Sequence, residues 1–101
     1  MKSTVITKST GDVFADLGFS PAEARNLRLR SDLMSALRNY IETEGLTQSD
    51  AAKRLKVSQP RVSDLMCGKL SKFSLDTLVN MVTDAGMDVS IRIRRLARRV
   101  A

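Results

Sequence analysis

The side chains best suited to specific chemistry lie close together between Thr47 and Lys72. Gln59 and Arg61 carry the amide and guanidinium groups that proteins use to recognise the edges of adenine and guanine. Ser58 precedes them as a helix-capping residue, and a capped helix N-terminus presents backbone N–H groups that can bind a phosphate. This pattern predicts that the segment binds DNA. The alternative is an ordinary pair of packed helices whose outer faces are polar for solubility alone.

Few residues suited to catalysis, metal binding or membrane contact are present. The chain has no histidine and a single cysteine, Cys67, which excludes Ser-His and Cys-His pairs, a Cys/His zinc site and an internal disulfide. We therefore predict no catalytic residue, no metal ligand and no cofactor. No apolar run approaches the ~20 residues that cross a bilayer, and the N-terminus lacks the apolar core of a signal peptide. A cytoplasmic protein without membrane contact is expected.

The charge of the chain is compatible with a polyanionic partner. Lys and Arg number 17 against 11 Asp and Glu in 101 residues, which gives a net charge of +6 and an isoelectric point near 10.1. Many basic proteins carry such charge only as hydrated surface side chains, so composition alone leaves both interpretations open. Lys69 and Lys72 follow the predicted recognition segment and are expected to contact phosphates without reading sequence.

Two short helices must position these side chains. Thr47 caps a predicted helix over residues 48–55, and Ser58 caps a second helix that ends near Gly68. Two helices joined by such a short turn form a helix-turn-helix, which places its second helix in the major groove of DNA. The apolar residues expected to face the core from the two helices are Ala51, Ala52, Leu55, Val62, Leu65 and Met66.

The neighbouring elements are predicted to complete an all-α domain. A helix begins after Ser20 and keeps helical spacing of apolar residues as far as Gly45, with a break where Ser31 can cap a new helix. Ser74 caps a last helix that ends at Gly86. The expected division of the chain is an N-terminal extension, a helix-turn-helix domain and a C-terminal segment, over residues 1–30, 31–86 and 87–101.

The N-terminal extension joins a polar arm to an apolar cluster. Residues 1–12 contain few groups that could be buried, and we expect them to form a flexible arm. Val13, Phe14, Leu17 and Phe19 follow directly. These four residues either bind a partner or cover the domain's own core, and the sequence leaves both open.

After the last predicted helix, apolar residues alternate with polar ones. Val89, Ile91 and Ile93 would lie on one face of a β-strand. A strand needs a partner backbone, which could be the same strand of a second chain in a homodimer or residues 3–7 of the same chain. Pairing across a two-fold axis would space the two recognition helices about one DNA turn, roughly 34 Å, apart.

The stretch TQSDAAKRLKVSQPRVSDLMCGK resembles the helix-turn-helix of the XRE family, to which the Cro and C1 repressors belong. The wider span from DVFADLGFS to FSLDTLVNMVTDAG is similar to XRE-type antitoxins of the HigA kind. The resemblance implies a five-helix, repressor-like domain, which here would begin near Ser31, and a dimer that binds an operator in double-stranded DNA.

The resemblance also implies roles for single residues. Gln48 corresponds to a glutamine that binds a phosphate and braces a second glutamine, here Gln59. Arg61 and Ser63 occupy positions that face bases or adjacent phosphates. One departure is Lys56, because the family often has glycine at this turn position, where a side chain is less easily accommodated.

Two functions compete most closely. The first is an antitoxin that represses its own operon and neutralises a RelE/HigB-like toxin ribonuclease bound through the N-terminal apolar cluster. The second is a stand-alone XRE-family repressor without a toxin. A basic protein that coats DNA without sequence preference is a third, and it predicts that Gln59→Ala with Arg61→Ala leaves DNA affinity nearly unchanged.

Overall fold

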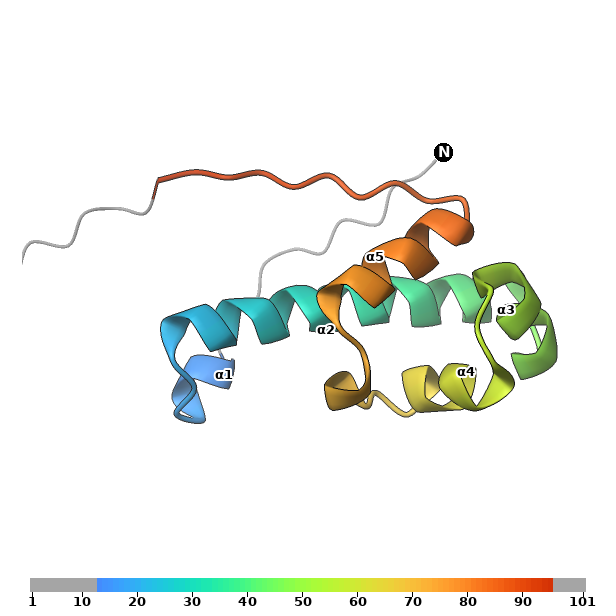
Figure 1. Ribbon diagram of the computed structural model, residues 1–101, viewed down its shortest axis with the longest axis horizontal. Helices are drawn as coiled ribbons and strands as arrows, with labels where there is room; N and C mark the ends of the chain where they lie inside the picture. Colours follow the sequence, from blue (N-terminus) through green and yellow to red (C-terminus); the bar gives the residue numbers. More distant parts are fainter. Residues whose placement is uncertain (1–12, 96–101) are drawn as a thin grey trace, which may run out of the picture.

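The computed structural model describes residues 13–95, which form an all-helical fold along one long helix (Figure 1). Its elements in chain order are α1 (Val13–Asp16), α2 (Pro21–Glu44), α3 (Gln48–Leu55), α4 (Gln59–Met66), the 3-10 turn η1 (Leu70–Lys72) and α5 (Leu75–Asp84). α1 lies against the N-terminal turns of α2, whereas α3, α4 and α5 gather around its C-terminal half. The recognition segment and α1 therefore lie near opposite ends of the longest helix.

Both ends of α2 are determined locally. The Glu23 N–H donates to Ser20 Oγ and the Ser20 N–H donates to Glu23 Oε1, each over 3.2 Å, which satisfies two backbone donors at the start of the helix. Gly45 ends the helix in the left-handed conformation, with φ 66°. The break expected at Ser31 does not form. No glycine or proline occurs between Pro21 and Gly45, and extending an existing helix costs less free energy than starting a new one.

The main hydrophobic core joins the C-terminal half of α2 to the helices that follow it. Its apolar side chains fill the space between α2, α3, α4 and α5, which fixes the angle at which α4 is held. The buried members are Met34, Leu37, Ile41, Ala51, Leu55, Val62, Leu65, Phe73, Leu78, Met81 and Val82.

The expected five-helix domain over residues 31–86 is not found. Four longer helices, α2 to α5, build the described fold, and α1 is a single turn of 4 residues that precedes them. The first helix of residues 31–86 is the C-terminal part of α2, which begins at Pro21 and not at Ser31. Between α4 and α5 the chain has room for only the 3-residue turn η1, because Ser74 already caps α5.

The predicted C-terminal strand is also not formed in the described part of the chain. Residues 87–95 have no regular secondary structure and run as an extended segment on the side of α2 away from α4 (Figure 1). Met87 and Val89 pack against the core, but Ile91 and Ile93 are 69% and 89% exposed. A strand requires hydrogen bonds to a neighbouring backbone. Apart from the helix-end bond from the Met87 N–H to the Val82 carbonyl, the described chain supplies none to this segment. Residues 3–7, the intramolecular candidate, lie outside the described residues.

The N-terminal apolar cluster is partly packed and partly exposed. The rings of Phe14 and Phe19 meet edge to face with centroids 6.4 Å apart. Ala24, in the turns of α2 against which α1 packs, is fully buried without belonging to the main core. Leu17, however, is 69% exposed, and Phe19 is 42% exposed. The side chain of Val13 lies outside the described residues.

Candidate nucleic-acid interface

The helix-turn-helix is formed as the sequence predicted. Thr47 Oγ1 accepts a hydrogen bond from the Asp50 N–H over 3.0 Å, and Ser58 Oγ accepts one from the Arg61 N–H over 3.3 Å. These bonds place the starts of α3 and α4 at the expected residues. The turn between the helices is three residues long, and α3 and α4 pack against each other.

Lys56 occupies the turn position that the family often fills with glycine. Its φ is 58°, so it adopts the left-handed conformation that glycine reaches without steric cost. Its backbone N–H donates to the carbonyl of Ala52, and its ammonium lies 3.8 Å from Asp84 Oδ1. The turn therefore forms with lysine in the left-handed conformation, at the cost of local backbone strain.

The orientation of α4 separates its core side from its outer side. Val62 and Leu65 are fully buried, whereas Ser58 and Gln59 at the start of the helix are exposed and Ser63 is partly exposed. Because Val62 and Leu65 pack into the core, the polar groups at the N-terminal end of α4 face away from the core.

Few backbone donors remain free at the start of α4. Pro60 has no N–H, and the Arg61 N–H is already bonded to Ser58. Of the first three residues of the helix, Gln59 alone keeps its N–H for a phosphate. This is fewer than the sequence pattern suggested.

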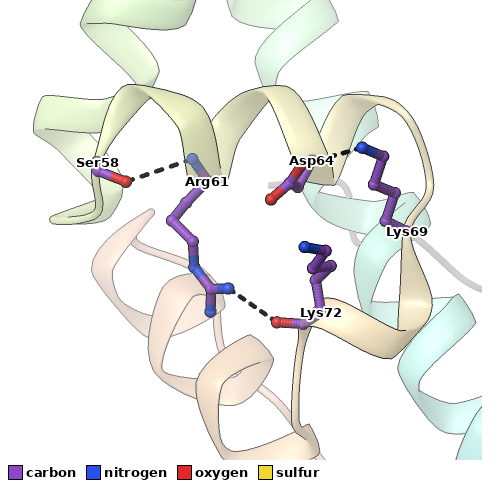
Figure 2. Close-up of polar contacts among 5 residues, drawn as sticks. All are labelled: Ser58, Arg61, Asp64, Lys69 and Lys72. Atoms are coloured by element: carbon purple, nitrogen blue, oxygen red, sulfur yellow. Dashed lines mark hydrogen bonds and ion pairs between the residues drawn. The ribbon is translucent and has the colours of Figure 1, made fainter.

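Arg61 points along the protein rather than outward from it. Its Nη1 donates a hydrogen bond to the backbone carbonyl of Lys72 over 2.8 Å (Figure 2). Its guanidinium carbon also lies 4.5 Å from the centroid of the buried Phe73 ring, a cation–π arrangement. In this conformation Arg61 connects α4 to the loop before α5, and its reading of bases stays a prediction.

The two lysines after α4 differ in their surroundings. Lys69 and Lys72 are both exposed, but Lys69 Nζ lies 3.4 Å from Asp64 Oδ1 and is partly neutralised by it. Figure 2 shows Lys72 reaching from the loop toward α4, on the side where Arg61 and Asp64 lie. The structure thus brings Ser58, Arg61, Asp64 and both lysines together.

Gln48 is separate from this group. It is exposed at the first position of α3, and in the part of the chain that the structure describes no hydrogen bond joins it to Gln59. Arg54, later in α3, donates to the Tyr40 hydroxyl over 3.2 Å and lies 3.6 Å from Glu44 Oε1. The hydrogen bond to Tyr40 is the main cause that raises the pKa of Arg54. These contacts connect α3 to α2.

One residue near the interface was missed by reasoning from the sequence. Arg30 Nη1 donates to the backbone carbonyls of Leu70 and Phe73 over 3.0 and 3.2 Å, although it lies 40 residues before Leu70. A signal was present, because Arg30 stands on the same helical stripe as the core residues Met34 and Leu37. An arginine on an apolar stripe indicates that its charged end has a partner in the tertiary structure.

Comparison with known proteins agrees with this geometry. A family model described as a helix-turn-helix domain matches residues 13–94. A solved structure named as an XRE family transcriptional regulator shares 35% sequence identity with this chain, with a TM-score of 0.70 over 78% of this chain and 89% of that chain. The chain belongs to the XRE family of helix-turn-helix proteins. No curated protein matches it.

The family match extends beyond the helix-turn-helix of this XRE protein. It begins at residue 13 and includes α1, the whole of α2 and the extended segment to residue 94. The N-terminal turn and the C-terminal segment are therefore parts of the family domain. No helix in the described range of this XRE protein has the length and apolar character needed to span a membrane.

Proposed function

We propose that this XRE-family chain is a sequence-specific DNA-binding transcriptional regulator that places α4 in the major groove. The observation that carries the proposal is the arrangement of α4, whose buried Val62 and Leu65 turn the exposed Ser58 and Gln59 outward beside the cationic loop. Gln59 is the main candidate for reading a base, and Gln48, Lys69 and Lys72 are candidates for phosphate contacts.

A finer proposal is that the regulator is an antitoxin that represses its own operon and neutralises a RelE/HigB-like toxin. The exposed apolar residues Leu17 and Phe19, between α1 and α2, support it, since they are 69% and 42% exposed. These two residues form the N-terminal patch. They follow α1, which lies at the other end of α2 from α4 (Figure 1), so a toxin bound there would leave the DNA-binding side uncovered. A stand-alone regulator agrees equally well with the family.

We also assign homodimerisation to the C-terminal segment. Ile91 and Ile93 extend beyond the core with exposed side chains, in a segment whose backbone groups after Met87 have no partner within residues 13–95. Pairing with the same segment of a second chain would satisfy those groups and bury both isoleucines, together with Val89.

The DNA-binding proposal is tested by a gel shift on the chain's own promoter with unrelated duplex as competitor. Gln59→Ala is expected to weaken promoter binding about tenfold or more, as for loss of a bidentate base contact of ~1–3 kcal/mol. Asn80→Ala is the matched control, because Asn80 is an exposed amide on α5. Equal binding of promoter and unrelated duplex by the unaltered chain would contradict sequence-specific recognition.

The antitoxin proposal is tested by co-expression of the tagged chain with the reading frame next to its gene. Co-purification of that partner with the unaltered chain, and its loss with Leu17→Asp, are expected if the N-terminal patch binds it. Leu17→Asp should retain the promoter shift, since Leu17 directly follows α1, which lies at the other end of α2 from α4 (Figure 1). A promoter shift with no co-purified partner would leave the stand-alone regulator.

A further inference from the structure

The loop that carries Lys69 and Lys72 has little internal structure to hold its shape. Its turn η1 spans 3 residues and has no side-chain cap. Its own backbone bonds are short-range, from the Lys72 N–H to the Lys69 carbonyl and from the Phe73 N–H to the Leu70 carbonyl. A turn of this length is only marginally stable, so the placement of the two lysines depends on contacts from outside the loop.

Two arginines from different helices supply such contacts, in addition to the bond from the Lys69 N–H to the Asp64 carbonyl of α4. Arg61 of α4 binds the Lys72 carbonyl over 2.8 Å. Arg30 of α2 binds the carbonyls of Leu70 and Phe73, one at each end of η1. Guanidinium groups thereby bind three loop carbonyls, of which the Leu70 carbonyl also accepts a hydrogen bond from the Phe73 N–H.

Arg30 is itself held in a defined position. Its Nε donates to Asn26 Oδ1 over 2.7 Å, one turn earlier on α2, and its side chain is partly buried. A single guanidinium nitrogen that bridges two carbonyls fixes both the distance and the direction between α2 and the loop. The loop is consequently attached to α2, the helix that anchors the whole core.

We propose that Arg30 is a positioning residue for DNA binding. It holds the two ends of η1 so that Lys69 and Lys72 face the phosphate backbone, and it does not itself contact DNA. The inference rests on the proposed DNA-binding function. It assigns to a residue of the N-terminal half of α2 a part in the interface formed by α4 and the following loop.

The experiment measures promoter affinity of Arg30→Gln against salt concentration, with Arg25→Gln as the matched control. Arg25 is an exposed arginine on the same helix, so both variants remove one positive charge. Loss of two phosphate contacts would reduce the slope of log affinity against log salt by about 1 to 2 and weaken binding about tenfold near physiological salt. Arg25→Gln is expected to change the slope by much less.

Two further variants separate positioning from general charge and from folding. Arg30→Lys keeps the charge but has no Nε to donate to Asn26, so the nitrogen that binds the two carbonyls is no longer held in place and the variant should remain impaired. Arg30→Gln placed on a chain with Lys69→Gln and Lys72→Gln should add little, because the groups that Arg30 positions are already gone. Circular dichroism identifies variants that have lost helix, and Arg30→Lys serves in place of Arg30→Gln if the latter unfolds.

The outcomes are distinct. If the unaltered chain binds the promoter and Arg30→Gln matches Arg25→Gln, this inference alone is overturned. The inference would also be overturned if Arg30→Gln weakened promoter affinity as much in the chain with Lys69→Gln and Lys72→Gln as in the unaltered chain. Arg30 would then act independently of the two lysines. If the unaltered chain does not bind the promoter at all, the proposed function and this inference are both overturned.

Discussion

The side chains predicted to contact DNA differ in whether they already have partners within the chain. Gln59 is exposed at the start of α4, whereas Arg61 is occupied by the Lys72 carbonyl and the Phe73 ring. Reading of bases by Arg61 would require it to give up a charged hydrogen bond and a stacking contact, which together stabilise the fold. At the residue scale, Gln59 is therefore the better candidate for sequence recognition, and Arg61 contributes first to the shape of the loop.

Asp64 leads to a prediction about affinity. Its carboxylate neutralises Lys69 at 3.4 Å, on the face that would meet phosphates. Asp64→Asn should therefore raise promoter affinity roughly threefold, because it removes a negative charge from the interface and frees Lys69. Fluorescence anisotropy with labelled promoter measures the change. Glu42→Gln, which neutralises an exposed carboxylate on α2, is the control and should have a smaller effect. Weaker binding by Asp64→Asn would indicate that Asp64 itself contacts a base.

At the scale of elements, the turn between α3 and α4 carries the clearest strain. Lys56 holds the left-handed conformation with φ 58°, and its ion pair with Asp84 is highly exposed and so compensates little. The helices on both sides are capped and packed, which is what keeps the lysine in this conformation.

We predict that Lys56→Gly stabilises the protein by about 1 kcal/mol, because glycine adopts the left-handed region without steric cost. The free energy of unfolding is measured by urea denaturation followed by helical circular dichroism. Lys53→Gly is the control. Lys53 is an exposed lysine inside α3, where glycine should destabilise by about 1 kcal/mol. Equal destabilisation by both variants would show that Lys56 is not strained.

At the scale of the whole molecule, two surfaces remain without a partner in the described chain. One is the N-terminal patch of Leu17 and Phe19, and the other is the extended segment with Ile91 and Ile93. Both are distinct from the outer face of α4 (Figure 1). The proposed contacts with DNA, with a second copy and with a protein partner would therefore use separate surfaces.

If the proposed homodimer forms through the C-terminal segment, removal of residues 91–101 converts it into a monomer without unfolding the domain. Met87 and Val89 stay in the truncated chain and continue to cover the core. Light scattering gives the mass, and circular dichroism checks that the helices persist. In the full-length chain, Ile91→Asp with Ile93→Asp should have the same effect while leaving the C-terminal arginines in place. A truncated chain that remains dimeric would place the dimer contact elsewhere.

The sequence by itself determined the elements whose causes are local. Ser20, Thr47, Ser58 and Ser74 each cap the helix predicted to follow, since a cap depends on groups within three residues along the chain. The core face of α4, the helix stop at Gly45 and the helix-turn-helix itself were predictable for the same reason. The family resemblance to XRE proteins also followed from this local pattern.

Only the tertiary structure decided the features that depend on residues far apart in sequence. Arg61 and Arg30 take their partners 11 and 40 or more residues away, and no local pattern specifies such a distance. The continuity of α2 through Ser31 was decided by competition between two locally acceptable states, in which extending the helix was favoured. The segment around Ile91 alternates as a strand does, but it forms none in the described chain, because a strand depends on a neighbouring backbone as well as on its own residues.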